Sequence, residues 1–475
     1  MTVRLTGHSL TLDEVVQVAR DGAAVLLDDD AADRMAATRA VVERALASGR
    51  VVYGMTTGVG AKKAATVDEA SAAAHSRLLV LNHRVGQGPL LPQDVVRAAL
   101  LRLANHLASG APGVRPELAR ALIDALNRGV TPDVRSLGSI GVADLSANAD
   151  LVDGALVDVP LAAGEGIALL NHNAVATGHA ALALADTAVF VDTLEVAGAL
   201  DVEAFAANVS VLDPAIDEAR PFPGLVESRR RIAAALEGSA VWTAAARNLQ
   251  DPLCFRCLPQ VHGAARDALR FALDRLAVEL NAHQGNPLVV DGDGERVVAV
   301  GNFDMLPLAG ALDLVRIALA PVLTAAVERT VKLLQRPLSG LPEGLAVRAG
   351  LAEDGLAEFG IAAQALVAEA RLLAEPVSFH VVSTTQAEGI EDRMTMVPLG
   401  ARRLAEIREL GCRIVAIELV VASQAVDLRG ARPLGRGTAE AHARVRELVA
   451  PLAEGAPIPL DLEPVAQLVR SGSIG

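Results

Sequence analysis

The chain has 475 residues, of which 52% are hydrophobic, 21% charged and 2% aromatic. Its formal net charge of −14 argues against a nucleic-acid partner and against binding to an anionic membrane surface. The mean hydropathy of +0.36 predicts a large core or apolar surface that is buried between subunits. This length allows roughly two to three domains.

The cysteine content and the N-terminal residues predict a cytoplasmic protein. Three cysteines, Cys254, Cys257 and Cys412, are too few for a disulfide scaffold and suit a reducing compartment. The opening MTVRLTGHSLTLDEVV lacks the apolar core of a signal peptide. Residues 166–185 are uncharged and long enough to cross a membrane, but their asparagines and histidines are costly in lipid. We therefore expect a buried helix there and no membrane partner.

Taken in chain order, the hydrophobic patterns predict a mainly α protein. Short strands are expected over residues 3–7 and 10–16, and a helix from Asp94. A hairpin is expected to turn at Gly292-Asp293-Gly294. Long helices follow at 306–334, from 356 to a stop at Pro376, and from 401 towards 428, which is typical of a helical bundle. The loop-rich segment 129–165 divides a mixed N-terminal domain, 1–165, from a helical bundle domain, 166–475.

Tyr53 is the only tyrosine of the chain and lies in a glycine-rich segment, VVYGMTTGVG. The segment lacks the spacing of a phosphate-binding loop. A phenol on such a loop can act as a general base or acid, or it can simply pack at the base of the loop. The residues alone leave both roles open.

Three further groups have the residue types of a reactive site. Arg256, within QDPLCFRCLPQVHG, needs an anion, either a structural carboxylate or a substrate one. Glu391 and Asp392 lie in a loop where they can handle protons or form a surface acidic pair. The single Cys254-x-x-Cys257 pair has no second pair and no histidine at ligand spacing, so no metal site is expected.

At these residues the sequence resembles the aromatic amino acid ammonia-lyases, the histidine, phenylalanine and tyrosine ammonia-lyases. VVYGMTTGVG is similar to their Y-G-x-N-T-G-F-G loop, and AAGEGIALLNHN to E-G-L-A-L-I-N-G-T. LQDPLCFRCLPQVHG is similar to Q-D-x-Y-S-x-R-C-x-P-Q-V-x-G, and GIEDRMTM to Q-E-D-H-V-S-M. These segments follow the family's order from near the N-terminus to the last helices.

The resemblance implies a subunit of the fumarase/aspartase-like superfamily, assembled as a homotetramer with active sites between subunits. It implies that Tyr53 is the catalytic base and that Arg256 clamps the substrate carboxylate. Glu391 would assist catalysis. The residues that would line the substrate pocket are His83, Asn171, Gln250 and Phe303.

The loop that builds the family's electrophile departs from the pattern. The family cyclises an internal Ala-Ser-Gly, followed by Asp-Leu, to methylidene-imidazolone, and the matching stretch here is GSIGVADLSAN. Without a gap, Val142-Ala143-Asp144 stands in place of the triad; with one residue deleted, Asp144-Leu145 matches the family's Asp-Leu and the triad is one residue short. It offers no serine to dehydrate and no glycine amide to attack. Ala-Ser-Gly does occur at 47–49 and 108–110, but in other parts of the pattern. We therefore predict that the prosthetic group is absent and that no other cofactor is required.

Without the electrophile, the substrate itself must supply an acidic proton, a better leaving group or a built-in acceptor. The sequence predicts an acid/base elimination, a conjugate addition or cyclisation, or an isomerisation of a small, amino-acid-like carboxylate. One alternative is a true ammonia-lyase or aminomutase. Others are a non-catalytic scaffold or partner subunit, and a ligand sensor.

Overall fold

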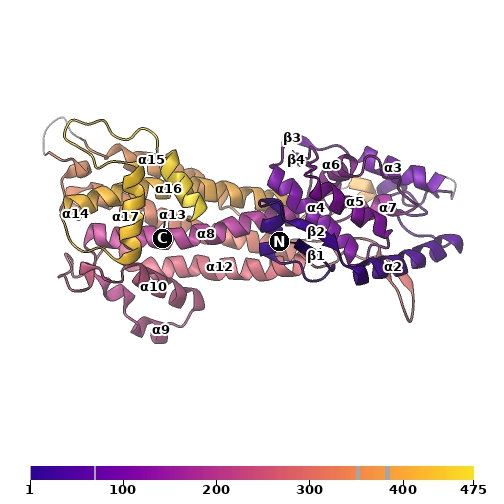
Figure 1. The fold of residues 1–475 in the computed structure, drawn as a ribbon, viewed down its shortest axis with the longest axis horizontal. Helices are drawn as coiled ribbons and strands as arrows, with labels where there is room; N and C mark the ends of the chain where they lie inside the picture. Colours follow the sequence, from indigo (N-terminus) through magenta and orange to yellow (C-terminus); the bar gives the residue numbers. More distant parts are fainter. Residues whose placement is uncertain (1, 69–70, 349–353, 380–385, 475) are drawn as a thin grey trace. The chain divides into compact units, whose positions relative to one another are not determined.

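The computed structural model describes residues 2–68, 71–348, 354–379 and 386–474, which are predominantly helical (Figure 1). The mainly α fold expected from the sequence is confirmed. The chain forms two compact units, each discontinuous in sequence. The first contains Met1–Ala185, Ala272–Leu312 and Pro376–Arg402, and the second contains Asp186–Phe271, Asp313–Glu375 and Arg403–Gly475. These units do not follow the single division expected at residue 165, because periodicity reports local structure and not which segments pack together.

Most of the first unit consists of short helices with three two-stranded sheets. Its elements are β1 (Thr2–Leu5), α1 (Leu12–Ala19), β2 (Ala24–Leu27), α2 (Asp29–Ala47), η1 (Gly60–Lys62), α3 (Ala72–Asn82), β3 (Gln87–Leu90), α4 (Gln93–Ala108), α5 (Pro116–Asn127), β4 (Arg135–Leu137), α6 (Leu145–Ala155), α7 (Glu165–Leu170), β5 (Leu288–Val290), β6 (Arg296–Val298) and η6 (Gln386–Gly389). β1 and β2 pair in parallel, and β3–β4 and β5–β6 pair antiparallel.

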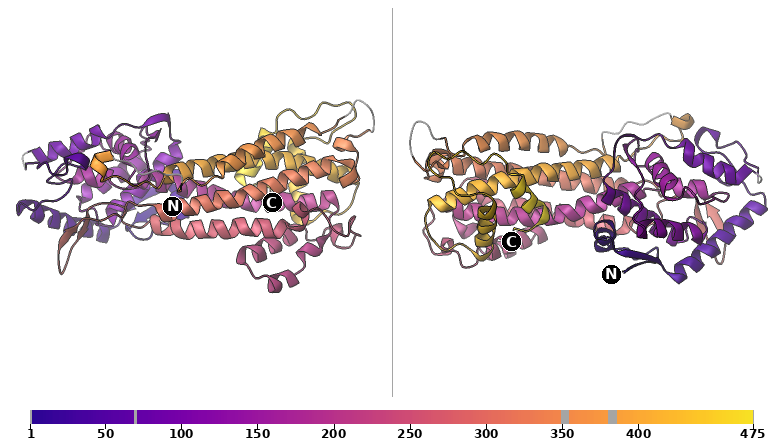
Figure 2. Two further views of the ribbon diagram at one scale, coloured as in Figure 1. Left: turned by 180° about the vertical axis from the view of Figure 1, so that it is seen from behind. Right: turned by 45° about the horizontal axis from the view of Figure 1, so that its top comes forward.

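Long helices dominate the second unit. Four helices have residues in both units: α8 (Ala174–Phe205), α12 (Leu258–Glu279), α13 (Leu306–Leu334) and α16 (Val397–Leu428). The remaining elements are η3 (Val209–Leu212), α9 (Ala215–Ala219), α10 (Pro223–Ala235), η4 (Ala240–Trp242), α11 (Leu253–Arg256), α14 (Arg336–Ser339), η5 (Glu343–Leu345), α15 (Glu358–Leu373), α17 (Arg436–Leu448) and α18 (Glu463–Ser471). Within the second unit the long helices run side by side (Figures 1 and 2).

The strand expected over residues 10–16 is wrong, because that segment begins helix α1. Thr11 is the N-cap, and its hydroxyl accepts the backbone N–H of Glu14 while the Glu14 carboxylate accepts the N–H of Thr11. This reciprocal capping box fixes the first helical turn. The alternation of apolar and polar residues at Leu10, Thr11 and Leu12 favoured a strand, but the capping box outweighs it. The structure confirms the expected β1, the hairpin β5–β6, and the helices α4, α13 and α15.

Two helical stretches are long and apolar enough to cross a membrane by length and composition alone. Among the described residues, they cover Glu165–Phe205 and Leu306–Leu334. Of the most apolar 18 residues in each, 78% are buried in the first stretch and 56% in the second. Such burial is typical of core helices in a bundle. The buried helix expected over 166–185 is interrupted at residues 171–173, where α7 ends and α8 begins.

A buried charge network joins three helices of the second unit. Arg329 on α13 donates to Asp201 on α8 at 2.7 Å and to Glu418 on α16 at 2.6 Å, and all three side chains are fully buried. Burial raises the pKa of Asp201 well above its usual range. Removing one partner would leave an uncompensated charge in the core, so this network specifies how these helices pack.

Candidate functional site

The first unit encloses a large cavity of about 1130 Å³. It is lined by residues that lie far apart in the sequence. They come from the glycine-rich segment that contains Tyr53 (the tyrosine loop), from the 138–145 loop and the start of α6, from the segment before α13 and from the 386–393 segment. Among the residues singled out from the sequence, it brings together Tyr53, His83, Val142, Ala143, Asn171, Phe303, Glu391 and Asp392. Pockets that recognise small ligands are commonly of this size or smaller.

The tyrosine and the glutamate meet at Gly60. The Tyr53 hydroxyl oxygen accepts the backbone N–H of Gly60 at 3.0 Å. A Cβ placed on Gly60 would lie 3.6 Å from Oε1 of Glu391, so both side chains approach the same glycine. Because the phenolic oxygen accepts the Gly60 bond, its own proton remains available to a second partner in the cavity.

Two ion pairs hold the segments that carry these groups. Lys63, next to the tyrosine loop, pairs with Glu388 at 3.1 Å, just before Glu391. Arg393 pairs with Asp304, whose other oxygen accepts the N–H of Leu306 at 2.9 Å at the start of α13. Lys63 and Arg393 are therefore both engaged with carboxylates.

The 138–145 loop brings Ala143 to the wall of the main cavity. Ala143 is buried, with a left-handed φ of 73°, and its N–H donates to Oδ1 of Asn173 at 3.1 Å. Such a φ is costly for a residue with a Cβ and persists only when its surroundings impose it. Val142 forms an isolated bridge with Asp304. The loop is thus fixed from both sides.

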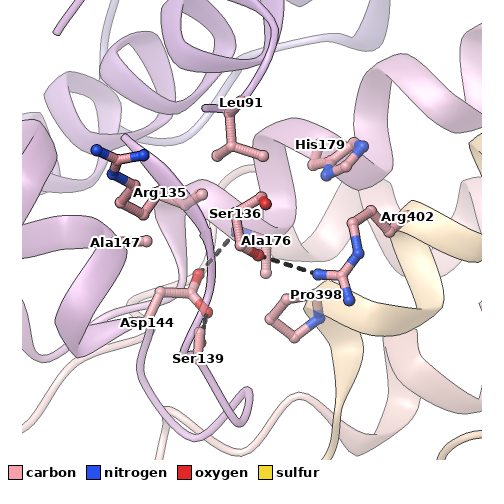
Figure 3. A pocket seen from close by; sticks show the side chains of 11 residues that line it. Leu91, Arg135, Ser136, Ser139, Asp144, Ala147, Ala176, His179, Pro398 and Arg402 are labelled. Atoms are coloured by element: carbon pink, nitrogen blue, oxygen red, sulfur yellow. Dashed lines mark hydrogen bonds between the residues drawn. The ribbon is translucent and has the colours of Figure 1, made fainter. Parts of the chain in front are cut away.

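Asp144 does not line the main cavity, and its carboxylate anchors the loop to α8 (Figure 3). Its carboxylate accepts the Ser139 hydroxyl at 2.6 Å and the Ala176 N–H at 2.8 Å. Complete burial raises the pKa of Asp144 to about 6, and these two bonds oppose the rise. The Ala176 N–H belongs to the first turn of α8, so Asp144 caps that helix. Asp144 therefore has a structural role in this loop.

A second, much smaller cavity of about 20 Å³ lies behind Asp144, among His179, Pro398 and Arg402 (Figure 3). Arg402 donates to the carbonyl of Ser136 at 3.0 Å. This volume suffices for one water molecule beside polar groups. It has no room for a substrate.

Two asparagines fix the wall of the main cavity. Nδ2 of Asn171 donates to the carbonyl of Asn286 at 3.1 Å, and Nδ2 of Asn173 donates to the carbonyl of Phe303 at 2.9 Å. These bonds connect the break between α7 and α8 to the segment before α13. Asn171 and Phe303 both line this cavity.

Beneath this wall three histidine rings pack together in the core, where His106 stacks on His283 and is tilted by 44° relative to His172. The His106 ring centroid lies 5.1 Å from that of His283 and 5.3 Å from that of His172. Nε2 of His172 lies 2.9 Å from the carbonyl of Leu169, and Nδ1 accepts the N–H of Ala174 at 3.2 Å, as in a neutral ring. The sequence did not reveal this group, since apolar spacing does not indicate which histidines pack together.

This stack predicts a loss of stability in acid. Burial lowers the pKa of His172 to about 3 and that of His283 to about 4, and it lowers the pKa of His106 well below its usual value, with the charge of Arg102 adding to each shift. The unfolded chain protonates these histidines near pH 6.5, so their stabilising contribution is present above that pH and lost as the pH falls. A fully shifted histidine costs on the order of 3 kcal/mol at pH 4.5. Urea unfolding between pH 7 and 4.5 should show this decline.

The matched variant is His172→Gln, which removes one of the three imidazoles. Between pH 6.5 and 5, the free energy of unfolding of this variant should fall less steeply in acid than that of the wild type. The difference in slope should correspond to the uptake of about one proton fewer on unfolding. A wild-type protein whose stability is constant across this range would contradict the account of the stack.

Gln250 and Arg256 belong to the second unit, and neither lines this cavity. Arg256 ends α11, where its side chain is exposed and has no carboxylate partner among the described residues. Gln250 is exposed in the preceding loop. Within the part of the chain that the structure describes, no group of three or more histidine, cysteine or acidic side chains is arranged to hold a metal ion.

Comparison with known proteins identifies the class. The family model of the aromatic amino acid lyases matches residues 10–157 and 151–447. Histidine ammonia-lyase of Alkaliphilus metalliredigens is 34% identical, over 99% of this chain and 97% of its own length.

Two solved structures are similar along the whole chain. The ergothioneine-degrading enzyme ergothionase of Treponema denticola, in complex with desmethyl-ergothioneine sulfonic acid, has a TM-score of 0.93 at 26% identity and covers 100% of this chain and 99% of its own. Tyrosine aminomutase of Streptomyces globisporus has a TM-score of 0.92 at 28% identity, with 100% and 98% covered. The chain belongs to the aromatic amino acid lyase family, as the sequence motifs implied.

Proposed function

We propose that this protein is a lyase that eliminates an already activated leaving group from a small amino-acid-like carboxylate, without methylidene-imidazolone. The observation that carries the proposal is the 138–145 loop, in which Val142, Ala143 and Asp144 replace the Ala-Ser-Gly triad in a cavity that keeps its tyrosine and glutamate.

The residues of this loop do not fit the prosthetic group. Ala143 has no hydroxyl to lose, so no methylidene can form from it. The N–H of Asp144 donates to the carbonyl of His172 at 2.8 Å, and the Asp144 side chain caps α8. The atoms that would have to cyclise are therefore chemically unsuitable or engaged in the fold.

A substrate with a good leaving group needs no electrophile. Ergothioneine, the compound that the similar enzyme of Treponema denticola degrades, is a trimethylammonium betaine. Breaking its Cα–N bond releases neutral trimethylamine, whereas a free amino group would need covalent activation. Trimethylated α-amino acids are therefore the first substrates to test on this chain.

Tyr53 and Glu391 would handle the proton in this reaction. Glu391 would first accept the phenolic proton of Tyr53 and pass it to solvent. The resulting phenolate oxygen takes a proton from Cβ, the C–H electron pair becomes the new C=C bond, and the Cα–N pair leaves with the amine. A positioned base supplies roughly 10²–10⁴-fold in rate. His83, Asn171 and Phe303 shape the cavity around the substrate.

Arg256 would complete the site from another copy of the chain, by binding the substrate carboxylate, with Gln250 beside it. Several large apolar side chains of the second unit are exposed and offer a surface for such assembly: Leu253, Leu314, Ile317, Ile361 and Leu372. A homotetramer in the cytoplasm, with small-molecule substrates and no nucleic-acid or membrane partner, fits this surface and the charge of the chain.

The test combines intact mass with a substrate panel. We expect the mass of the unmodified chain, since cyclisation of a triad would remove two water molecules. L-histidine, L-phenylalanine and L-tyrosine should give no arylacrylate absorbance. Their α-trimethylammonium derivatives and ergothioneine should be tested in parallel, and at least one should release trimethylamine together with an unsaturated acid.

The alternatives give different results. Arylacrylates formed from the free amino acids, with a mass two waters short, would establish an ammonia-lyase of the usual kind, and β-amino products would establish an aminomutase. If no compound reacts but one raises the thermal midpoint, the protein is a ligand sensor. If no compound reacts and none raises the thermal midpoint, the protein is a scaffold or a partner subunit.

A further inference from the structure

We propose that Arg393 binds a second carboxylate of the substrate, so that the main cavity selects amino-acid-like dicarboxylates over monocarboxylates. The inference rests on the proposed function, in which Arg256 holds the first carboxylate, and it deepens that function by naming the substrate class. It concerns binding, and binding can be measured whether or not turnover occurs.

The guanidinium of Arg393 is only partly used by the protein. Arg393 lines the main cavity, and its side chain is 54% exposed. Its Nε donates to Oδ2 of Asp304, and within the described part of the chain its two Nη groups have no hydrogen-bond partner. A guanidinium carries five N–H donors in a rigid fork. The Nη end of the Arg393 fork is therefore free to form two parallel hydrogen bonds with a carboxylate.

Asp304 holds this guanidinium in one orientation. Its Oδ1 accepts the N–H of Leu306 at 2.9 Å, and its own N–H donates to the carbonyl of Gly301 at 3.1 Å. Val142, in the 138–145 loop, forms the isolated bridge with Asp304. Asp304 is thus fixed in place before it bonds to Arg393. A side chain that is already oriented loses less conformational freedom when a ligand binds.

The charges around Arg393 suit a molecule that carries both signs of charge. Lys63 lines the same cavity and pairs with Glu388 at 3.1 Å. Glu391 and Asp392 also line it, and neither forms an ion pair with any described residue. The trimethylammonium group of the proposed substrates can therefore face a carboxylate of the wall, while a second carboxylate of the substrate faces Arg393. Such complementary charges favour one orientation of the ligand.

A dicarboxylate gains affinity over a monocarboxylate only where its second charge finds a partner. Taking a carboxylate out of water without a partner is costly, so an unpaired second carboxylate would weaken binding. The Nη groups of Arg393 supply that partner, whereas a monocarboxylate leaves them to water. One charged hydrogen bond changes an affinity by roughly 10- to 100-fold.

The experiment is titration calorimetry of the full chain with pairs of saturated acids of equal chain length: pentanoate and glutarate, hexanoate and adipate, heptanoate and pimelate. At least one diacid should bind about tenfold more tightly than the monoacid of its pair. In Arg393→Met this preference should disappear, while the affinity for the monoacid changes less than about twofold. Arg393→Lys keeps the charge but lacks the fork, so it should retain only part of the preference.

Arg20→Met is the matched control. Arg20 also lies in the first unit, and its Nε also donates to Oδ2 of an aspartate, Asp94, at 3.1 Å, but neither residue lines the main cavity. This variant should keep the preference of the wild type. Ion pairs at the surface contribute little to stability, so the Arg20 and Arg393 variants should both stay folded, and their thermal midpoints check this.

Four results would overturn the inference: equal affinity within every pair, no binding of any acid, an unchanged preference in Arg393→Met, or a lost preference in Arg20→Met. An equal loss of affinity for both members of a pair in Arg393→Met would do the same, because Arg393 would then hold the first carboxylate. A diacid preference that depends on Arg393, together with a silent substrate panel, would instead refute only the proposed reaction.

Discussion

Tyr53→Phe should abolish turnover while leaving the fold intact. The variant removes only the phenolic oxygen, which lies beside Gly60 and across from Glu391 in the cavity wall. Losing a positioned base lowers kcat by roughly 10²–10⁴-fold. Losing the bond from the Gly60 N–H costs roughly 0.5–1.5 kcal/mol of stability, which leaves the chain folded. The measurement is kcat on the reactive substrate of the panel, with the thermal midpoint recorded alongside.

Ser71→Ala is the control for this substitution. It also deletes a hydroxyl from the first unit, but that hydroxyl is exposed and bonds to Asp68 at 3.1 Å, away from the cavity. Its kcat should equal that of the wild type. If Tyr53→Phe also retained wild-type kcat, another group would have to be the base, and Glu391 would be the first to examine.

The long helices were predictable because their signals are local. Apolar residues recur every three or four positions through 306–334, and α13 begins and ends at those residues. The break at residues 171–173 was not predicted. It depends on Asn171 and Asn173 bonding to carbonyls more than a hundred residues away. Such long-range bonds leave no periodic signature in the sequence.

The residues of the candidate site divide in the same way: local motifs identify some of them, and only long-range packing reveals the role of the others. Motif likeness predicted Tyr53, His83, Asn171, Phe303 and Glu391, and all five line one cavity. The sequence did not indicate what the Asp144 side chain does, and only the structure shows that its carboxylate accepts the N–H of Ala176 in the first turn of α8.

Arg256→Met should lower kcat/KM for carboxylate substrates by roughly 10- to 100-fold, through a higher KM, a lower kcat or both. A charged hydrogen bond contributes about 1.5–3 kcal/mol, and a guanidinium can form two with one carboxylate. The exposed Arg256 side chain makes no ion pair with any described residue, so it remains available for a ligand. The substitution should therefore affect substrate binding more than folding.

Arg256→Lys separates charge from geometry, because it keeps the charge but cannot form the two-pronged contact. It should recover part of the lost kcat/KM and no more. Arg128→Met is the control, since Arg128 is also exposed and its side chain donates to the backbone carbonyl of Asp124. An unchanged kcat/KM in Arg256→Met would show that Arg256 does not bind the substrate carboxylate. The cations that line the main cavity, Lys63 and Arg393, would then be the next to test. Both are already paired with carboxylates, so a substrate would have to share Lys63 with Glu388 or Arg393 with Asp304.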